Sequence, residues 1–422
     1  MQKKYKKILI LSCFFPPSTM PASSRTYGFA KYLYRYGYKP TIISRKWDDY
    51  QNLKDFYSPS NFKNIEYLSC RNFNAYLLPY NPNFRDRLVN KKGFIFTIMR
   101  KIISTLSFLL YPFNIRFSPY YPIYFFANEL LYKEKYDAIL ATGNPFELFR
   151  IAKKISIKHN VPYILDYRDD WSTSELNLNN NFSGKIKRLY FRILEKSWTK
   201  KSRFFISVTP NYVSKIKNII NIEGIVIYNG YFTKFYNTTF NEFSFLYSGN
   251  LYKQQNLEIV FKAFANFKNN VSKFFKIYFV GNENKVSIDY YINKYSLKNN
   301  VIIINKQPMA KTHLYLAKSY GYLLFPYSNL KGILTTKLFE YLSYQKPILL
   351  CPSDKDVMED ILLKTQTGLI ANTVDECYNM LIYLFNQYQT GQPAINPNIN
   401  EIVKYSRKAQ TKRLAEILDQ KL

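Results

Sequence analysis

Short apolar runs alternate with helical patterns along the whole chain. In the first half, apolar runs predict strands at residues 8–14, 38–44, 136–142, 163–167 and 204–209, and helical patterns fall at 24–36, 144–159 and 183–200. Asn144, Pro145 and Glu147 have the spacing of a helix cap, a first-turn proline and a reciprocal acid. The order strand, loop, helix, strand over residues 8–44 is that of a parallel βαβ unit.

The second half repeats this order. Strands are predicted at 243–248, 276–280, 301–305, 322–325, 347–350 and 368–371, with helices at 256–267, 289–295, 311–318, 336–344, 356–364 and 374–388. We therefore expect an α/β protein of two doubly wound, Rossmann-like domains, 1–225 and 226–400, followed by a terminal helix, 401–422. Ligands of such domains bind at the carboxyl ends of the strands, so the active site is expected in a cleft that both domains face.

An apolar insert, residues 85–126, interrupts the first domain. Charged residues divide it into pieces shorter than the roughly 20 residues of a spanning helix. Its apolar positions follow helical spacing on one face: Ile95, Ile98, Met99, Ile102, Leu106, Leu109 and Leu110, with Arg85, Arg87, Lys91 and Lys92 upstream. This pattern indicates either a helix lying on an anionic membrane surface or one packed on its own domain.

Charge and composition narrow the chemistry. The formal net charge of +31 requires an anionic partner or a strongly solvated surface. Two histidines exclude a histidine-rich metal cluster, and four cysteines without C-x-x-C spacing indicate a reduced, cytosolic protein. Nucleic acid is not expected as a partner, because no zinc, helix-turn-helix or RNP-like motif occurs.

Several segments resemble one family in the same order. They are residues 8–44, the DYRDDW segment 166–171, VIYNG at 226–230, FLYSGNLY at 245–252 and GILTTKLFEYLSYQKPIL at 332–349. Together they resemble retaining GT-B glycosyltransferases of family four, the group 1 enzymes of bacterial surface polysaccharide synthesis. The resemblance implies a GT-B fold, a nucleotide-diphosphate sugar as donor, no metal or other cofactor, and a terminal helix that returns to the first domain.

The expected donor site lies in the second half. Backbone amides before a predicted helix favour a diphosphate, and Lys337 and Glu340 share one face of that helix. Their spacing alone fits an ordinary pair of surface charges equally well. The resemblance to the family implies that Glu340 binds the ribose of the nucleotide. Lys253 is the one cation in its loop and is assigned to the diphosphate, with a solvent-facing lysine as the alternative. The donor-binding set is Gly249, Asn250, Lys253, Gly332, Ile333, Leu334, Thr335, Lys337 and Glu340.

Candidates for acceptor chemistry follow the predicted strands of the first half. Asp169 is expected to orient or deprotonate the acceptor hydroxyl, and Arg168 or Arg25 to neutralise phosphate. Trp171 is expected to line the acceptor site, and Asn144 is expected to bind the acceptor beside it. A local ion-pair network among Asp166, Arg168 and Asp169 is the alternative. We reject Asp354-x-Asp356 as a metal site, because so short a motif recurs by chance.

These features predict a hexosyl- or N-acetylhexosaminyltransferase. Its acceptor is expected to be a lipid-linked glycan in O-antigen or capsule synthesis, and its place the inner face of the cell membrane, peripherally bound from the cytoplasm. Three alternatives stay open: a nucleic-acid-binding protein, a non-catalytic membrane-associated protein on the same fold, and a sugar-nucleotide epimerase.

Overall fold

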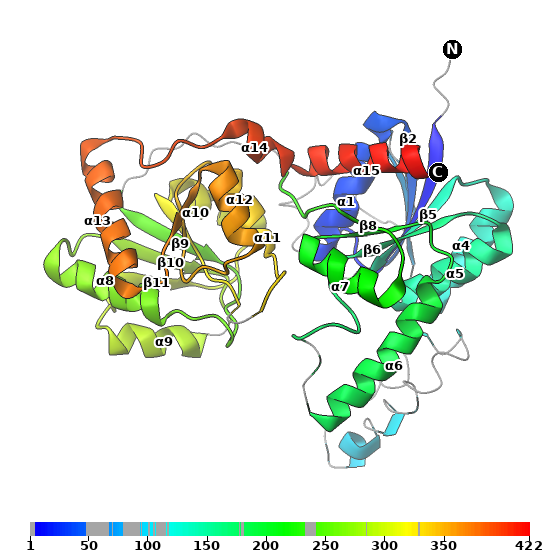
Figure 1. Cartoon of the computed structure of the whole chain (residues 1–422), viewed down its shortest axis with the longest axis horizontal. Coiled ribbons are helices and arrows are strands. Elements are labelled where there is room, and N and C mark those ends of the chain that lie inside the picture. The colour runs from blue at the N-terminus through cyan, green and yellow to red at the C-terminus, as the bar shows by residue number, and fades with distance from the viewer. Residues whose placement is uncertain are drawn as a thin grey trace. The chain divides into compact units, whose positions relative to one another are not determined.

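The chain forms two compact units in the computed structural model (Figure 1). The structure describes residues 5–47, 67–69, 71–78, 93, 95–99, 102, 103, 106, 115, 118–176, 178, 181–232, 242–283, 285–327 and 330–422. The first unit comprises Met1–Ile227 and Thr411–Leu422, and the second comprises Tyr228–Gln410. Most of the insert at 85–126, with its upstream cations, lies outside the described residues.

The first unit contains an eight-stranded sheet of order β3-β4-β2-β1-β5-β6-β7-β8. Its strands are β1 (Lys6–Ser12), β2 (Tyr38–Arg45), β3 (Tyr67–Ser69), β4 (Asn74–Leu78), β5 (Ala138–Gly143), β6 (Tyr163–Tyr167), β7 (Phe205–Ser207) and β8 (Gly224–Val226). All neighbours are parallel except β3 and β4. The carboxyl ends of β1, β5 and β6 therefore lie together at one edge.

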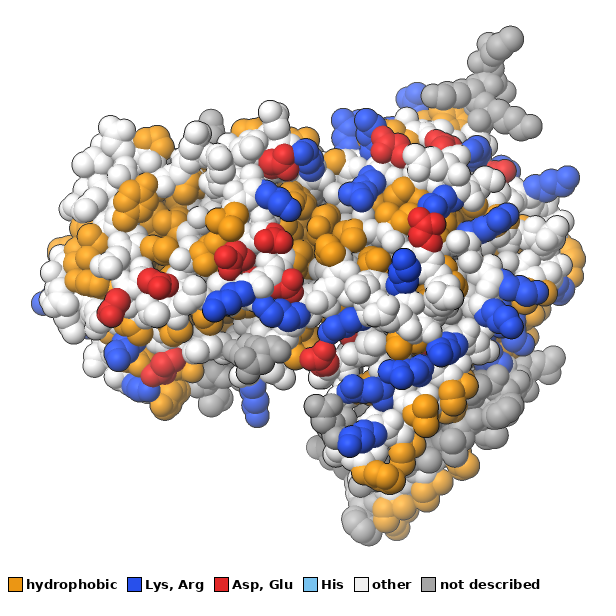
Figure 2. All heavy atoms as spheres, in the orientation of Figure 1, with side chains coloured by type: hydrophobic (Ala, Val, Ile, Leu, Met, Phe, Trp, Pro, Cys, Tyr) orange, Lys and Arg blue, Asp and Glu red, His pale blue; other side chains and the backbone are white. Residues whose placement is uncertain are grey.

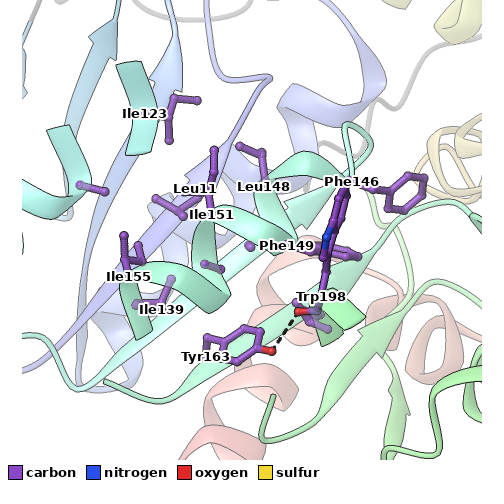
Figure 3. Packing of buried hydrophobic residues seen from close by; sticks show 14 of the residues in the cluster. Leu11, Ile123, Ile139, Phe146, Leu148, Phe149, Ile151, Ile155, Tyr163 and Trp198 are labelled. Atoms are coloured by element: carbon purple, nitrogen blue, oxygen red, sulfur yellow. Dashed lines mark hydrogen bonds between the residues drawn. The ribbon is translucent and has the colours of Figure 1, made fainter. Parts of the chain in front are cut away.

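Both faces of this sheet are covered by helices. They are α1 (Pro21–Leu33), α4 (Tyr121–Lys133), α5 (Glu147–His159), α6 (Phe182–Thr199), α7 (Pro210–Ile220) and the final α15 (Arg407–Lys421), with a short 3₁₀ turn at Tyr34–Tyr36. Leu9 and Leu11 pack with α4 and α5 in one core, whereas Ile8 and Ile10 pack with α1 and α15 in the other. Fully buried parallel strands need apolar residues on both faces, which explains the unbroken apolar runs in the sequence. Figure 3 shows the first of these cores, where the Tyr163 hydroxyl donates to the carbonyl of Trp198.

The predicted cap at Asn144 is wrong. Helix α5 begins at Glu147 with Phe146 at the cap position and no capping side chain. The guanidinium of Arg168 instead binds the carbonyl oxygens of Gly143, at 2.9 Å, and Asn144, at 2.5 Å. These bonds hold residues 143 and 144 outside the helix.

The second unit contains a six-stranded parallel sheet of order β11-β10-β9-β12-β13-β14. Its strands are β9 (Ser244–Ser248), β10 (Lys276–Val280), β11 (Val301–Ile304), β12 (Gly321–Leu324), β13 (Ile348–Leu350) and β14 (Gly368–Ile370). Its helices are α8 (Glu258–Asn270), α9 (Lys285–Lys294), α10 (Met309–Lys318), α11 (Thr336–Leu342), α12 (Val357–Thr365), α13 (Val374–Thr390) and α14 (Ile399–Lys404). Two buried apolar clusters flank the sheet, so both predicted doubly wound folds are confirmed.

The predicted single helix over 401–422 is broken. Helix α14 ends at Lys404 and α15 begins at Arg407, because the backbone of Tyr231 bonds to both sides of the break. The Tyr231 amide donates to the carbonyl of Tyr405, and the Arg407 amide donates to the carbonyl of Tyr231. Gly230 permits this approach, since a Cβ there would stand 2.6 Å from the Tyr405 oxygen.

Among the residues that the structure describes, no helix combines the length and the apolar character that a bilayer crossing requires.

Candidate functional site

Two glycines end neighbouring strands of the second sheet. Gly249 follows β9 with φ of 85°, and Gly281 follows β10 with φ of 78°. The amide of Gly249 donates to the carbonyl of Val280 at 2.7 Å. Residues with a Cβ are strained at such φ angles, so glycine allows both strands to turn sharply at the carboxyl edge.

Lys337, near the start of α11, lies against this edge. A Cβ on Gly249 would stand 3.1 Å from Cε and 3.4 Å from Nζ of Lys337. The same Nζ lies 5.1 Å from the centre of the Tyr247 ring. Burial lowers the pKa of Lys337 to about 8, and the charge of Glu340 opposes only part of this shift. A desolvated cation at the carboxyl edge of a parallel sheet is well placed for an anionic ligand.

Glu340 lies one helical turn after Lys337. Burial raises the pKa of Glu340 to about 7, and the charge of Lys337 lowers it in part. Lys337 and Glu340, both of which the structure describes, do not form an ion pair with each other. The next residue, Tyr341, fixes the helix to β9, because its hydroxyl accepts a 2.9 Å hydrogen bond from the Ser248 amide. The edge thus carries a cation and a carboxylate on one anchored helix.

The loop before α11 uses one of its expected amides internally. Gly332 donates its N–H to Asp356 at 2.5 Å, so this amide is not open to a ligand as expected from the sequence. Thr335 caps α11, with its hydroxyl accepting from the Lys337 amide at 3.4 Å. Ile333 is half-buried, whereas Leu334 packs into the apolar core beneath the helix.

The loop after β9 is held by its own side chains. The Asn250 side chain accepts from the Glu283 amide at 2.9 Å, and Asn282 accepts from the Leu251 amide at 3.1 Å. Gln255 donates to the carbonyl of Phe325. Lys253 lies exposed on this loop, and its assignment to the diphosphate stays a prediction.

Replacing Gly249 with Ala is expected to destabilise the protein by roughly 1–3 kcal/mol, because the alanine is strained at this φ and its Cβ displaces Lys337. Denaturant unfolding measures the loss. Gly37→Ala is the matched control, since Gly37 has φ of 89° and nothing within 4 Å of its Cβ position. An equal loss in both variants would show that the contact with Lys337 contributes nothing.

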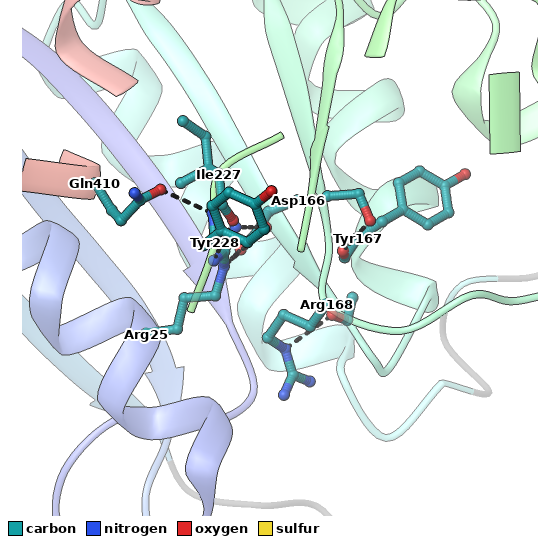
Figure 4. A network of polar contacts seen from close by, with 9 residues as sticks. Arg25, Asp166, Tyr167, Arg168, Ile227, Tyr228 and Gln410 are labelled. Atoms are coloured by element: carbon teal, nitrogen blue, oxygen red, sulfur yellow. Dashed lines mark hydrogen bonds and ion pairs between the residues drawn. The ribbon is translucent and has the colours of Figure 1, made fainter. Parts of the chain in front are cut away.

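In the first unit, Arg25 and Asp166 form a fully buried ion pair (Figure 4). Nη2 of Arg25 lies 2.8 Å from Oδ1 of Asp166, Nε contacts both carboxylate oxygens, and Nη1 donates to the carbonyl of Ile227 at 2.9 Å. Arg25 is only 1% exposed. It is therefore engaged within the unit instead of lying open to a ligand phosphate as expected, and its pair with Asp166 differs from the alternative network of Asp166, Arg168 and Asp169.

The other first-unit candidates separate into two groups. Asp169 and Asn144 are exposed, and Arg168 is half-buried at the carboxyl end of β6, where burial lowers its pKa. Trp171 is buried and stacks on Phe146, with the ring centres 4.8 Å apart. Trp171 thus belongs to the core and not to an acceptor wall, because it continues the packing of α5.

Glu147 is a candidate that the sequence reading did not identify. It begins α5, just after β5, and burial raises its pKa to about 7. Cys13, at the end of β1, interacts electrostatically with both Glu147 and Arg168. An acid that titrates near neutrality therefore lies at the same edge as Arg168. The sequence does not reveal Glu147 as a site residue, because its spacing from Asn144 is that of the reciprocal acid in a helix cap.

Asp354 and Asp356 hold backbone amides. Asp354 accepts from Met358 at 2.9 Å and from Glu359 at 3.1 Å at the start of α12, while Asp356 binds Gly332. These contacts account for the Asp-x-Asp spacing without a cation. Among the described residues, no group of three or more His, Cys, Asp or Glu side chains is arranged to hold a metal.

Solved structures match the chain over nearly its whole length. Sucrose-phosphate synthase from Thermosynechococcus elongatus is 12% identical with a TM-score of 0.64, and each chain is covered to 98%. HepE from Anabaena, solved with UDP and glucose, is 14% identical with a TM-score of 0.63, covering 98% of this chain and 100% of HepE. The fold is GT-B. A Listeria monocytogenes protein assigned as a UDP-N-acetylglucosamine 2-epimerase also matches, with 10% identity, a TM-score of 0.54 and coverage of 99% and 96%.

A family match falls within the second GT-B unit. Residues 234–383 match the family described as glycosyl transferases group 1. This range contains Gly249, Lys337 and Glu340, so the sequence match covers the half-buried cation and carboxylate of the second unit. A comparison with curated proteins gives no significant match.

Proposed function

We propose that this chain transfers a sugar from a nucleoside-diphosphate sugar to an acceptor. The observation that carries the proposal is Lys337 beside Gly249, with Glu340 one helical turn further along α11, within the segment that matches group 1 glycosyltransferases. Glu340 accepts hydrogen bonds from the ribose diol, and Lys337 binds the diphosphate together with the loop before α11. Gly249 keeps the edge open for the close approach of the donor.

The reaction proposed is a hexosyl or N-acetylhexosaminyl transfer with retention, as in family four. The charge on the leaving diphosphate is stabilised by Lys337, with Lys253 and the amides of Ile333 and Leu334 as further contacts. No metal or other cofactor is required for this stabilisation. In the first unit, Arg168 neutralises phosphate and the exposed Asp169 orients or deprotonates the acceptor hydroxyl. Arg25 and Trp171 are positioning residues beneath them.

The acceptor proposed is a lipid-linked glycan of a cell-surface polysaccharide. The protein would then work from the cytoplasm, peripherally bound to the inner face of the membrane. The excess of Lys and Arg over Asp and Glu, 60 against 29, favours attachment to an anionic surface.

An epimerase acting on a nucleotide sugar is the second candidate, because the epimerase-like structure shares the fold over 99% of this chain. The two reactions differ in their requirements. An epimerase converts its nucleotide sugar without any acceptor, whereas a transferase releases nucleoside diphosphate in proportion to the acceptor consumed. Incubation with single nucleotide sugars, followed by chromatography of the sugar, therefore separates them.

Thermal stabilisation by nucleoside diphosphates and nucleotide sugars tests the donor site. We expect UDP or GDP and their sugars to stabilise the wild-type protein, and Glu340→Gln to weaken this binding by about 10–150-fold, since a hydrogen bond to a charged group contributes roughly 1.5–3 kcal/mol. Glu129→Gln, which removes an exposed carboxylate from α4, is expected to bind as the wild type does. Equal affinity in Glu340→Gln and wild type, or no stabilisation by any of these nucleotides, would contradict the proposal. In the latter case a nucleic-acid-binding or non-catalytic role would stand in its place.

A further inference from the structure

Helix α6 has two apolar faces, and only one of them packs against other described residues. Leu194 and Trp198 pack into the core of the first unit. A second stripe is exposed: Phe182 (80%), Ile186 (54%), Leu189 (62%) and Ile193 (59%). Its spacings of four, three and four residues place all four side chains on one side of the helix. At about 100° per residue this side lies opposite the buried one.

Cations run beside the exposed stripe. Lys185, Arg192 and Lys196 are exposed, and each follows a stripe residue by three positions, so they form one row along its edge. Figure 2 shows Lys and Arg side chains and apolar side chains as adjacent rows over α6. The one carboxylate in this helix, Glu195, is buried and accepts from the Ser172 amide. The exposed surface of α6 therefore carries cations but no carboxylate.

The described part of the insert shows the same character. Residues 95–99 are helical, and exposed apolar side chains follow the predicted face: Ile95, Ile98, Met99, Ile102 and Leu106. In Figure 1 this segment and the start of α6 project from the same end of the first unit. Exposed apolar surface of this extent marks an interaction site.

We propose that α6 lies on an anionic lipid bilayer, with its stripe in the boundary between headgroups and acyl chains. Lys185, Arg192 and Lys196 then meet anionic headgroups at the level where an interfacial helix holds its polar flank. A polynucleotide would use the cations but not the apolar stripe, and a second copy of this chain would place two cationic rows against each other. The proposal rests on the proposed function in one respect: it names the element that brings the transferase to a lipid-linked acceptor.

Vesicle co-sedimentation of the full-length protein tests this inference. The probes are vesicles of phosphatidylcholine alone and of phosphatidylcholine with about 30% phosphatidylglycerol, at low and high salt. We expect binding to the anionic vesicles that weakens with salt. Lys185→Gln/Arg192→Gln/Lys196→Gln is expected to lower the partition coefficient by about 100-fold at low salt, since each cation near such a surface contributes roughly fivefold.

Ile186→Ser/Leu189→Ser/Ile193→Ser is expected to reduce binding by more than about tenfold at both salt concentrations, because it removes buried methylene groups and no charge. Matched controls remove exposed residues of the second unit: Leu314→Ser/Leu363→Ser/Val403→Ser for the stripe, and Lys262→Gln/Lys298→Gln/Lys364→Gln for the charge. The controls should bind vesicles as the wild type does.

Each possible result has a distinct meaning. Vesicle binding that is unchanged in both α6 variants overturns the inference, as does a dimer or an RNA complex that these variants disrupt while vesicles are not bound. Binding of nucleoside diphosphate is measured in the same variants and is expected to be unaffected. A protein that binds nucleotide but not vesicles refutes only the role of α6, whereas one that binds vesicles through α6 but no nucleotide refutes the donor site.

Discussion

Replacing Lys337 with Met is expected to stabilise the protein and, at the same time, to remove most of its affinity for a nucleoside diphosphate. Burial lowers the pKa of Lys337 from 10.5 to about 8, which means that the folded protein holds this proton less tightly than the unfolded chain. The protonated lysine therefore costs folding free energy, in full below pH 8. Met has a similar length and carries no charge, so the variant should melt at a higher temperature, by roughly 2–4 °C per kcal/mol for a domain of this size.

The same charge is expected to attract the diphosphate. Its loss should weaken UDP or GDP binding by about 10–150-fold. In the wild type, affinity is expected to fall as the pH rises through about 8, because the free lysine then loses its proton. Lys337→Met should lack this pH dependence. Calorimetric titration between about pH 6 and about pH 10, roughly two units to either side of the lysine pKa, measures both effects.

Lys346 provides the matched control. Burial also lowers its pKa to about 8, but its ammonium donates to the carbonyls of Ala317 and Ser319. Lys346→Met leaves two carbonyls without this donor, so it is expected to destabilise the protein and to leave nucleotide affinity unchanged. If Lys337→Met lowers the melting temperature, or binds nucleotide with wild-type affinity, the role proposed for Lys337 is wrong.

Arg25→Met is expected to destabilise the first unit by about 3–5 kcal/mol, because Asp166 is left charged and fully buried. Asp166→Leu should cost about as much, since it leaves the guanidinium without its carboxylate. The double variant is expected to recover most of the loss, because an apolar pair of similar volume replaces the ion pair without a buried charge. Denaturant unfolding of the four proteins gives the coupling energy.

Lys412 and Glu416 supply the comparison on the surface. Both are exposed, with their charged atoms 3.7 Å apart, and Lys412→Met is expected to change stability by less than about 0.5 kcal/mol. A loss of this small size in Arg25→Met would mean that the buried pair is not formed.

The sequence is sufficient to locate most strands along the chain, because buried parallel strands need unbroken apolar runs. The runs at 243–248 and 276–280 correspond closely to β9 and β10. It does not reveal β3, β4 or β8, which form the two ends of the first sheet. The break between α14 and α15 is also hidden, since it depends on the backbone of Tyr231, far away in the chain.

The candidate site divides in the same way. Lys337 and Glu340 are found from the sequence because three residues of helix bring them together. The spacing of residues along the sequence does not show which side chains become buried against distant strands and helices. Arg25 reaches its partner Asp166 across 141 positions, and Trp171 stacks on Phe146 through the packing of α5 and β6. Glu147 can be recognised only from the three-dimensional structure, because burial is the one cause that raises its pKa.

The return of α15 to the first unit has a consequence for synthesis of the chain. Leu414, Ala415, Ile417 and Leu418 complete the apolar core that Ile8 and Ile10 begin. Domains are generally expected to fold as they leave the ribosome, the N-terminal one first. Here one face of the N-terminal sheet lacks part of its cover until residues 414–418 have been translated. The first unit to be made is therefore the last to be finished, and the second unit can fold while the first still exposes that face.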